Sequence, residues 1–149
     1  CKWQARHHAF TYYEGTFYVV RKNNFESILG LHEEYKAIAN EIADQMSTSG
    51  FFSSTDNLKK MIEKKTSIHK KLMKIKKLGA LDTISPQVIK KMKSTGKKYD
   101  SEITLDHEGR IVLESEEDID RTIKLLSDYF KRGEVSGNAY GTFSGIKLN

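Results

Sequence analysis

The sequence predicts an α+β fold with an N-terminal β-hairpin, a helical middle and a C-terminal β-hairpin followed by a helix. Three observations support this prediction. Aromatic and β-branched residues flank a short turn near the start, and apolar residues recur every three or four positions through the middle. Short apolar runs then return near residue 103. With 149 residues, 38% of them apolar, the chain has the size and composition of a single domain.

The first predicted element is the N-terminal hairpin. Residues 9–13 and 16–20 are rich in aromatic and β-branched side chains, as strands are. Glu14 and Gly15 stand between them and predict a two-residue turn. A short helix is expected next, over residues 25–29.

Amphipathic helices are predicted at residues 32–46, 56–79 and 86–96. The third begins with Ser85 as a cap and Pro86 in its first turn. Gly79 and Gly96 are expected to end the second and third helices, because glycine readily adopts the left-handed backbone found there. Whether residues 66–67 divide the second helix in two remains open at this point.

The last third predicts a second hairpin and a helix. Residues 103–113 contain two short apolar runs around a four-residue turn that ends in Gly109. Ser115 and Asp118 have the spacing of a capping box, and the helix that they begin is expected to continue to Gly133.

The closing segment is rich in glycine and contains two aromatic residues, Tyr140 and Phe143. Exposed aromatic rings can stack on nucleic-acid bases. We expect both rings to pack against the domain instead.

Charge is distributed very unevenly along the chain. Residues 59–98 contain fourteen lysines and only two acidic residues, Glu63 and Asp82. These forty residues therefore have a formal charge of +12. The other 109 residues hold eleven basic and eighteen acidic side chains and sum to −7. Such a cationic zone attracts polyanions, and nucleic acid is the leading candidate.

Lysines on the outward faces of the predicted helices are the candidate DNA contacts. Acidic residues in the zone are too few to neutralise them through i,i+4 pairs. Lysine outnumbers arginine twenty to five and contacts phosphate as a point charge, so we expect duplex DNA to be bound independently of its sequence. The candidates are Lys59, Lys60, Lys70, Lys71, Lys74, Lys77, Lys90, Lys91, Lys93, Lys97 and Lys98.

The sequence contains little that indicates an enzyme or a metal-binding protein. We expect no cofactor and no metal. His7 and His8 are adjacent, so on a strand they would point to opposite faces. His69 and His107 are expected at the surface or at its boundary. A metal-dependent nuclease using the carboxylates near Asp106 remains a second alternative, although no Glu-x-Lys pattern lies on either predicted strand.

Several segments, taken in order, resemble one bacterial family. They are the strand that leads into residues 21–29, the basic segment 72–77, the strand 111–113 before an acidic helix start, and residues 128–140. These are similar to the C-terminal domain of the KwaB-like proteins of the Kiwa anti-phage system. The resemblance implies a cytoplasmic, oligomeric defence protein that acts with a small membrane-protein partner and is associated with DNA binding. It also implies that the chain, which lacks an initiating Met, is the C-terminal part of a longer protein.

The alternative to DNA binding is an assembly module. In this hypothesis the hairpin and helix surfaces dimerise beside a membrane partner, and the lysines face anionic lipid. An exposed aromatic stripe formed by Tyr12, Tyr13, Phe17 and Tyr18 would favour assembly.

Overall fold

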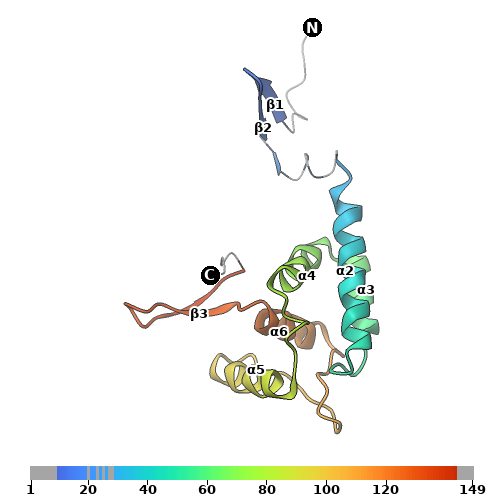
Figure 1. Ribbon diagram of the computed structural model, residues 1–149, viewed down its shortest axis with the longest axis vertical. Helices are drawn as coiled ribbons and strands as arrows, with labels where there is room; N and C mark the ends of the chain where they lie inside the picture. The colour runs from blue at the N-terminus through green and yellow to red at the C-terminus, as the bar shows by residue number, and fades with distance from the viewer. Residues whose placement is uncertain (1–9, 20, 23, 25, 27–28, 144–149) are drawn as a thin grey trace. The chain divides into compact units, whose positions relative to one another are not determined.

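The computed structural model describes residues 10–19, 21–22, 24, 26 and 29–143 (Figure 1). The chain divides into two compact units, Cys1–Tyr35 and Lys36–Asn149. Helices dominate the second unit, and the strands occur in short antiparallel pairs. The predicted α+β class is thus confirmed.

The first unit contains the predicted N-terminal hairpin. Strand β1 (Phe10–Tyr13) pairs antiparallel with β2 (Thr16–Val19). Glu14 and Gly15 form the turn with φ angles of +47° and +79°, the left-handed values that favour a tight hairpin turn. Most of the short helix predicted over 25–29 lies outside the described residues.

Three helices follow: α2 (Leu31–Thr48), which begins in the first unit, α3 (Asp56–Lys64) and α4 (Thr66–Leu78). Lys65 has an extended backbone, with φ −130° and ψ 102°, and therefore separates α3 from α4. Lysines before and after this break do not share one continuous helix face. Gly79 ends α4 with φ +64°, as predicted.

Helix α5 (Pro86–Lys98) begins as predicted, because Ser85 Oγ accepts a hydrogen bond from the Val88 N–H at 3.3 Å. The prediction that Gly96 ends the helix is wrong. Gly96 is buried inside it, and a Cβ atom there would lie 2.5 Å from the Ser101 carbonyl oxygen. Glycine thus permits a close backbone approach at this position.

The predicted hairpin around residues 106–109 is present in a short form. Leu105 and Ile111 make an antiparallel bridge, and Ile111 also makes a parallel bridge to Phe52 in the connector between α2 and α3. Gly109 has the expected positive φ, +77°.

Helix α6 (Glu116–Leu126) starts with the predicted capping box. Ser115 Oγ accepts from the Asp118 N–H at 3.0 Å, and the Asp118 carboxylate accepts from the Ser115 N–H at 3.0 Å. The expectation that this helix continues to Gly133 is wrong, since it ends at Leu126.

The chain after α6 forms a β-ribbon that was not predicted. Asp128 has a φ of +50°, which a continuing right-handed helix cannot contain. Strand β3 (Phe130–Arg132) then pairs antiparallel with β4 (Ala139–Gly141). Within the second unit, Figure 1 shows this ribbon extending away from α4, α5 and α6.

The second unit is built around an apolar core. Helix α6 contacts α3, α4 and α5 and so lies at the centre of the unit. The largest fully buried apolar side chains are Ile42, Met46, Leu58, Ile62, Ile68, Leu72, Ile75, Ile111 and Ile119.

Candidate nucleic-acid interface

Helix α5 carries the densest group of solvent-exposed cations. Ile89, Met92 and Gly96 are buried, whereas every lysine of the helix is exposed. The helix contains no acidic residue, and in the described part of the chain none of its lysines makes an ion pair. We call this group the α5 lysines: Lys90, Lys91, Lys93, Lys97 and Lys98.

Lysines of α3 and α4 have acidic partners on α2. Lys59 Nζ lies 2.6 Å from the Asp44 carboxylate, and Lys76 Nζ lies 2.7 Å from the Glu41 carboxylate. Each pair joins two helices and offsets a positive charge that a polyanion would otherwise meet. Lys59 is therefore a weaker candidate for phosphate contact than its place in the charge run suggests.

A second set of ion pairs reaches α6. Lys71 Nζ lies 3.2 Å from one oxygen of Asp120, and Lys124 Nζ lies 2.7 Å from the other. Partial burial disfavours the charged carboxylate, but the hydrogen bonds from Lys124 and Lys71 outweigh it and lower the pKa of Asp120. Lys65 pairs in the same way with Glu116, at 2.5 Å.

Lys71 and Lys74 also hold the segment that follows β4. Lys74 Nζ donates a hydrogen bond to the Phe143 carbonyl, and Lys71 Nζ lies 4.9 Å from the centre of the Phe143 ring. Partial burial, followed by repulsion from Lys131, lowers the pKa of Lys74. Phe143 packs against the core, as predicted. These two lysines are thus half-buried and do not form an open cationic face.

The remaining candidates, Lys60, Lys70 and Lys77, are exposed. Lys60 lines a hollow of about 180 Å³ together with Glu114 and Glu116, which place negative charge beside it. Lys64 lines the same hollow and is exposed as well, although it was not among the candidates. Its position within the lysine-rich run of residues 59–98 is the sequence feature that could have identified it as a candidate.

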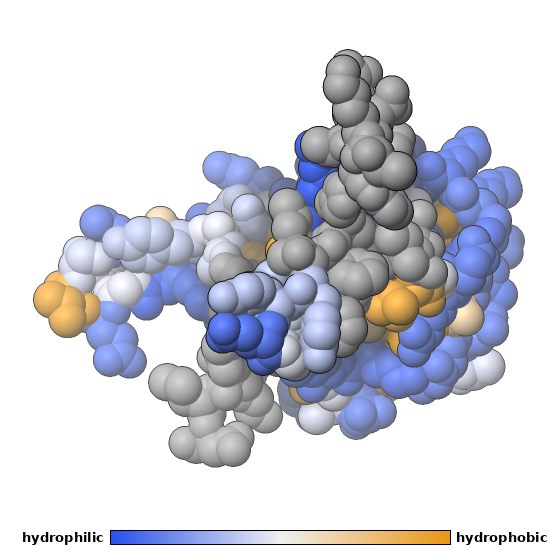
Figure 2. Space-filling view, turned by 90° about the horizontal axis from the view of Figure 1, so that it is seen from above, coloured by the Kyte–Doolittle hydropathy of each residue, from blue (hydrophilic) through white to orange (hydrophobic). Residues whose placement is uncertain are grey.

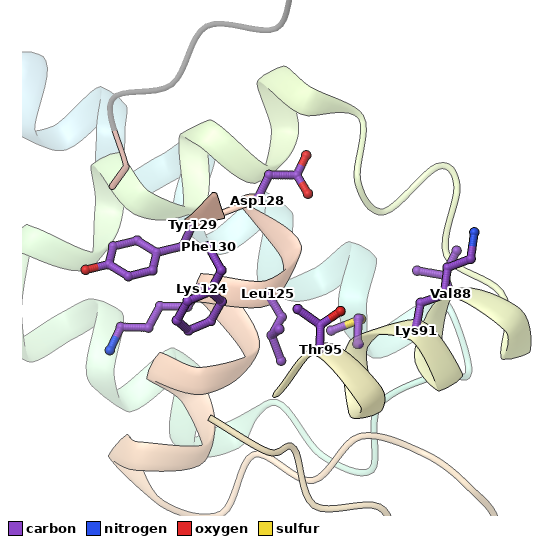
Figure 3. Close-up of a pocket in the computed structure, with 9 residues that line it drawn as sticks. Val88, Lys91, Thr95, Lys124, Leu125, Asp128, Tyr129 and Phe130 are labelled. Carbon is purple, nitrogen blue, oxygen red and sulfur yellow. The ribbon is translucent and has the colours of Figure 1, made fainter. Parts of the chain in front are cut away.

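A larger hollow, of about 290 Å³, lies between α5, the end of α6 and the start of β3 (Figure 3). Val88, Lys91 and Thr95 of α5 lie on one side, while Lys124, Leu125 and residues 128–130 lie on the other. One of the α5 lysines therefore borders a cavity that has aromatic side chains on its opposite side.

Asp106 has structural partners within its own turn. Its carboxylate accepts hydrogen bonds from the Glu108 and Arg110 N–H groups, each at 2.9 Å, and from Arg110 Nε at 2.8 Å. The backbone hydrogen bond from Arg110 is the main cause that lowers the pKa of Asp106. Among the residues that the structure describes, no three His, Cys, Asp or Glu side chains gather as metal ligands would.

His69 is only 3% exposed, so the expectation of a surface or boundary position is wrong. Its Nε2 atom lies 2.8 Å from the Ile62 carbonyl oxygen, because the break at Lys65 brings α4 against α3. His107 is exposed, as expected, whereas His7 and His8 lie outside the described residues.

Comparison with known protein families shows which family this chain belongs to. The family described as "Kiwa protein KwaB-like" matches residues 6–136. The chain belongs to this KwaB-like family. Membership indicates a component of the Kiwa anti-phage defence system and confirms the resemblance seen in the sequence. No curated protein and no solved structure matches the chain.

The match covers the helices that contain the candidate lysines of this KwaB-like chain. It includes all helices from α2 to α6, and it ends at Ser136, between β3 and β4. Across the described residues, no helix has both the length and the apolar content needed to cross a bilayer.

Among the described residues of the KwaB-like chain, exposed aromatic side chains lie on the N-terminal hairpin and on β4. On the N-terminal hairpin, Tyr12, Tyr13 and Tyr18 are 61%, 63% and 52% exposed, and the side chain of Phe17 lies outside the description. On β4, Tyr140 is 52% exposed, so the expectation that it packs against the domain is wrong.

Proposed function

We propose that this KwaB-like chain binds duplex DNA, independently of its sequence, as part of a Kiwa anti-phage complex. The observation that carries the proposal is the contrast between two groups of lysines. The α5 lysines are exposed and lack acidic partners within the described residues, whereas Lys59, Lys65 and Lys76 are each paired with a carboxylate.

The chemistry of these side chains favours the phosphate backbone over the bases. An ammonium group on a flexible stem offers a point charge, while reading a base edge favours the two-pronged guanidinium of arginine. All basic residues of α5 are lysines. We therefore place the main contact surface on α5, with Lys60, Lys70 and Lys77 as further contacts, and we assign the chain no enzymatic step.

The test compares two triple variants that change the net charge equally. Lys90→Gln, Lys91→Gln and Lys93→Gln together remove three charges that lack acidic partners; Lys59→Gln, Lys65→Gln and Lys76→Gln together remove three that are paired. We expect the first variant to lose roughly tenfold or more in affinity for a 30-base-pair duplex at 0.1 M salt. The second should stay within about threefold of the parent, because its lysines hold carboxylates and lie outside the proposed contact surface on α5.

The measurement is fluorescence anisotropy with labelled duplex, with circular dichroism to verify that both variants fold. Equal losses in the two variants would mean that only net charge matters. A larger loss in the second variant would place the binding surface on α3 and α4 and contradict the assignment to α5.

The exposed tyrosines favour a second candidate function, assembly. A two-stranded hairpin with exposed aromatic side chains is marginally stable alone and gains from a partner surface. In this alternative Tyr12, Tyr13 and Tyr18 contact another copy or a membrane-protein partner, and the lysines lie against anionic lipid. Tyr12→Ser with Tyr18→Ser should then lower the oligomer mass measured by light scattering and leave duplex affinity unchanged. An unchanged mass would argue against a role of this hairpin in self-assembly.

A further inference from the structure

The β3–β4 ribbon ends in an apolar residue that points into solvent. Its strands pair Lys131 with Tyr140 and Arg132 with Ala139, and residues 133–138 form the tip. Val135, in this tip, is fully exposed. Seen from above, Figure 2 shows an apolar spot at the end of an otherwise polar arm. The arm thus presents one apolar side chain at its far end.

Hydrogen bonds fix the shape of the tip. The Gly133 N–H donates to Asn138 O at 2.9 Å, and the Gly137 N–H donates back to Gly133 O at 2.8 Å. Arg132 Nε donates to Gly137 O at 2.9 Å, and Gly137 itself has a φ of +68°. The tip is therefore closed by its own hydrogen bonds, and Val135 lies on its outside.

The base of the ribbon is joined to the cationic helix. Tyr99, the residue after α5, stacks on Phe130 of β3 with ring centres 4.6 Å apart and planes 3° apart. Lys97 and Lys98 lie in the last turn of α5, directly before this stack. The hollow of about 290 Å³ lies between α5 and the start of β3. Helix α5 and the base of the ribbon thus line the same hollow.

The ribbon has a positive net charge. Lys131 and Arg132 on β3 are exposed, and Glu134 in the tip is the acidic residue between residues 130 and 141. Lys131 and Tyr140 are cross-strand partners and so share one face of the ribbon, where a cation and an aromatic ring stand together. This combination fits a polyanion with flat bases better than it fits an apolar protein surface.

We propose that the β3–β4 ribbon enters the minor groove of a duplex held on α5, where Val135 acts as a wedge against a base-pair step. This proposal rests on the duplex binding proposed above and adds that the bound chain bends the duplex. Proteins that bind the minor groove insert apolar side chains between base pairs, which unstacks the step and bends the duplex. Such binding favours steps that are already weak, such as mismatches and TA steps, and needs no base-specific contact.

The test measures bending separately from affinity. Energy transfer between dyes on the two ends of a 30-base-pair duplex reports its end-to-end distance when the full chain binds. We expect the parent to shorten this distance and to bind a duplex with one central mismatch about threefold to tenfold more tightly than a fully paired one. Val135→Ser should abolish both effects while keeping the affinity for paired duplex within about threefold. Val135→Ile, which keeps an apolar wedge, should behave as the parent.

The outcomes separate this proposal from the proposed function. Duplex binding without any change in end-to-end distance, or bending that Val135→Ser leaves intact, would overturn the wedge alone. No binding to any duplex would overturn both proposals. A final arm uses vesicles that contain an anionic phospholipid. If Val135→Ser weakened vesicle binding and left the DNA behaviour unchanged, the tip would be a lipid contact and the wedge would be overturned.

Discussion

Gly96 is the residue at which backbone packing most directly limits the choice of side chain. Alanine would ordinarily stabilise a helix interior by about 1 kcal/mol relative to glycine. Here a Cβ atom would lie 2.5 Å from Ser101 O and 2.9 Å from Glu102 Cα, and both of these are backbone atoms. We predict that Gly96→Ala lowers the free energy of unfolding by roughly 1–3 kcal/mol, measured by urea denaturation. Ser94→Ala, at an exposed position in the same helix, is the control; equal stability of both variants would refute the close approach.

Asp106 should make stability depend on pH in the acidic range. Its folded-state pKa is lowered, first by the Arg110 backbone hydrogen bond, so the folded protein binds this proton less readily than the unfolded chain does. The stabilisation is therefore complete above the unfolded pKa of about 3.9 and is lost as the pH falls through the folded pKa. We predict that Asp106→Asn melts below the parent at pH 7 and that the gap narrows below about pH 4. A gap of constant size from pH 7 to pH 3 would show that the charge is not the cause.

His69 shows that the burial of a single residue cannot be predicted from the sequence when it depends on how two helices pack. Its place on the flank of a predicted helix led us to expect a surface or boundary position. The residue is nevertheless buried, because α4 packs against α3 after the break at Lys65 and the imidazole reaches the Ile62 carbonyl. The capping box at Ser115 was predictable, since its partners lie only three residues apart.

At the scale of elements, periodic and capped segments were predicted well and the ribbon was missed. Apolar spacing through Leu126 and Phe130 suggested a helix that continues to Gly133. In the structure Asp128 has a positive φ, which ends the helix, and β3 pairs with β4. That pairing joins residues seven to eleven positions apart. Strand pairing of this kind depends on contacts that helical periodicity does not report.

Helix α4 offers the clearest test of the predicted division between core and surface. Leu72 has no exposed surface and lies among the core residues of the second unit. We predict that Leu72→Ala lowers the free energy of unfolding by roughly 2–5 kcal/mol. Lys77→Ala, at an exposed position on the same helix, should change it by no more than about 0.5 kcal/mol. Thermal and urea denaturation of both variants would decide; a small effect of Leu72→Ala would contradict its place in the core.

At the scale of the whole molecule, sequence revealed the charge asymmetry but not which lysines have acidic partners. The partners lie far along the chain: Asp44 pairs with Lys59, Glu41 with Lys76, and Asp120 with Lys71. The charge of +12 between residues 59 and 98 is thus partly neutralised by the acidic residues outside it. The α5 lysines are a group within the run that makes no ion pair among the described residues.

No nuclease activity is expected from the chain. Asp106 accepts hydrogen bonds from its own turn and from Arg110, which suits a structural role. We predict that the chain leaves supercoiled plasmid intact in the presence of magnesium or manganese. Reproducible cleavage that Asp106→Ala or Glu102→Ala removes would show that these carboxylates are catalytic.

The salt dependence of duplex binding tests the central claim most directly, because each neutralised phosphate contributes a slope of about −0.9. With about five phosphates engaged, the logarithm of the affinity should fall by roughly 4 to 5 units per tenfold rise in salt. The variant with Lys90, Lys91 and Lys93 changed to Gln should lose roughly 2 to 3 units of that slope. The variant with Lys59, Lys65 and Lys76 changed to Gln should keep the slope of the parent. A slope near zero in the parent, or equal slopes in the parent and the α5 variant, would contradict phosphate binding through α5.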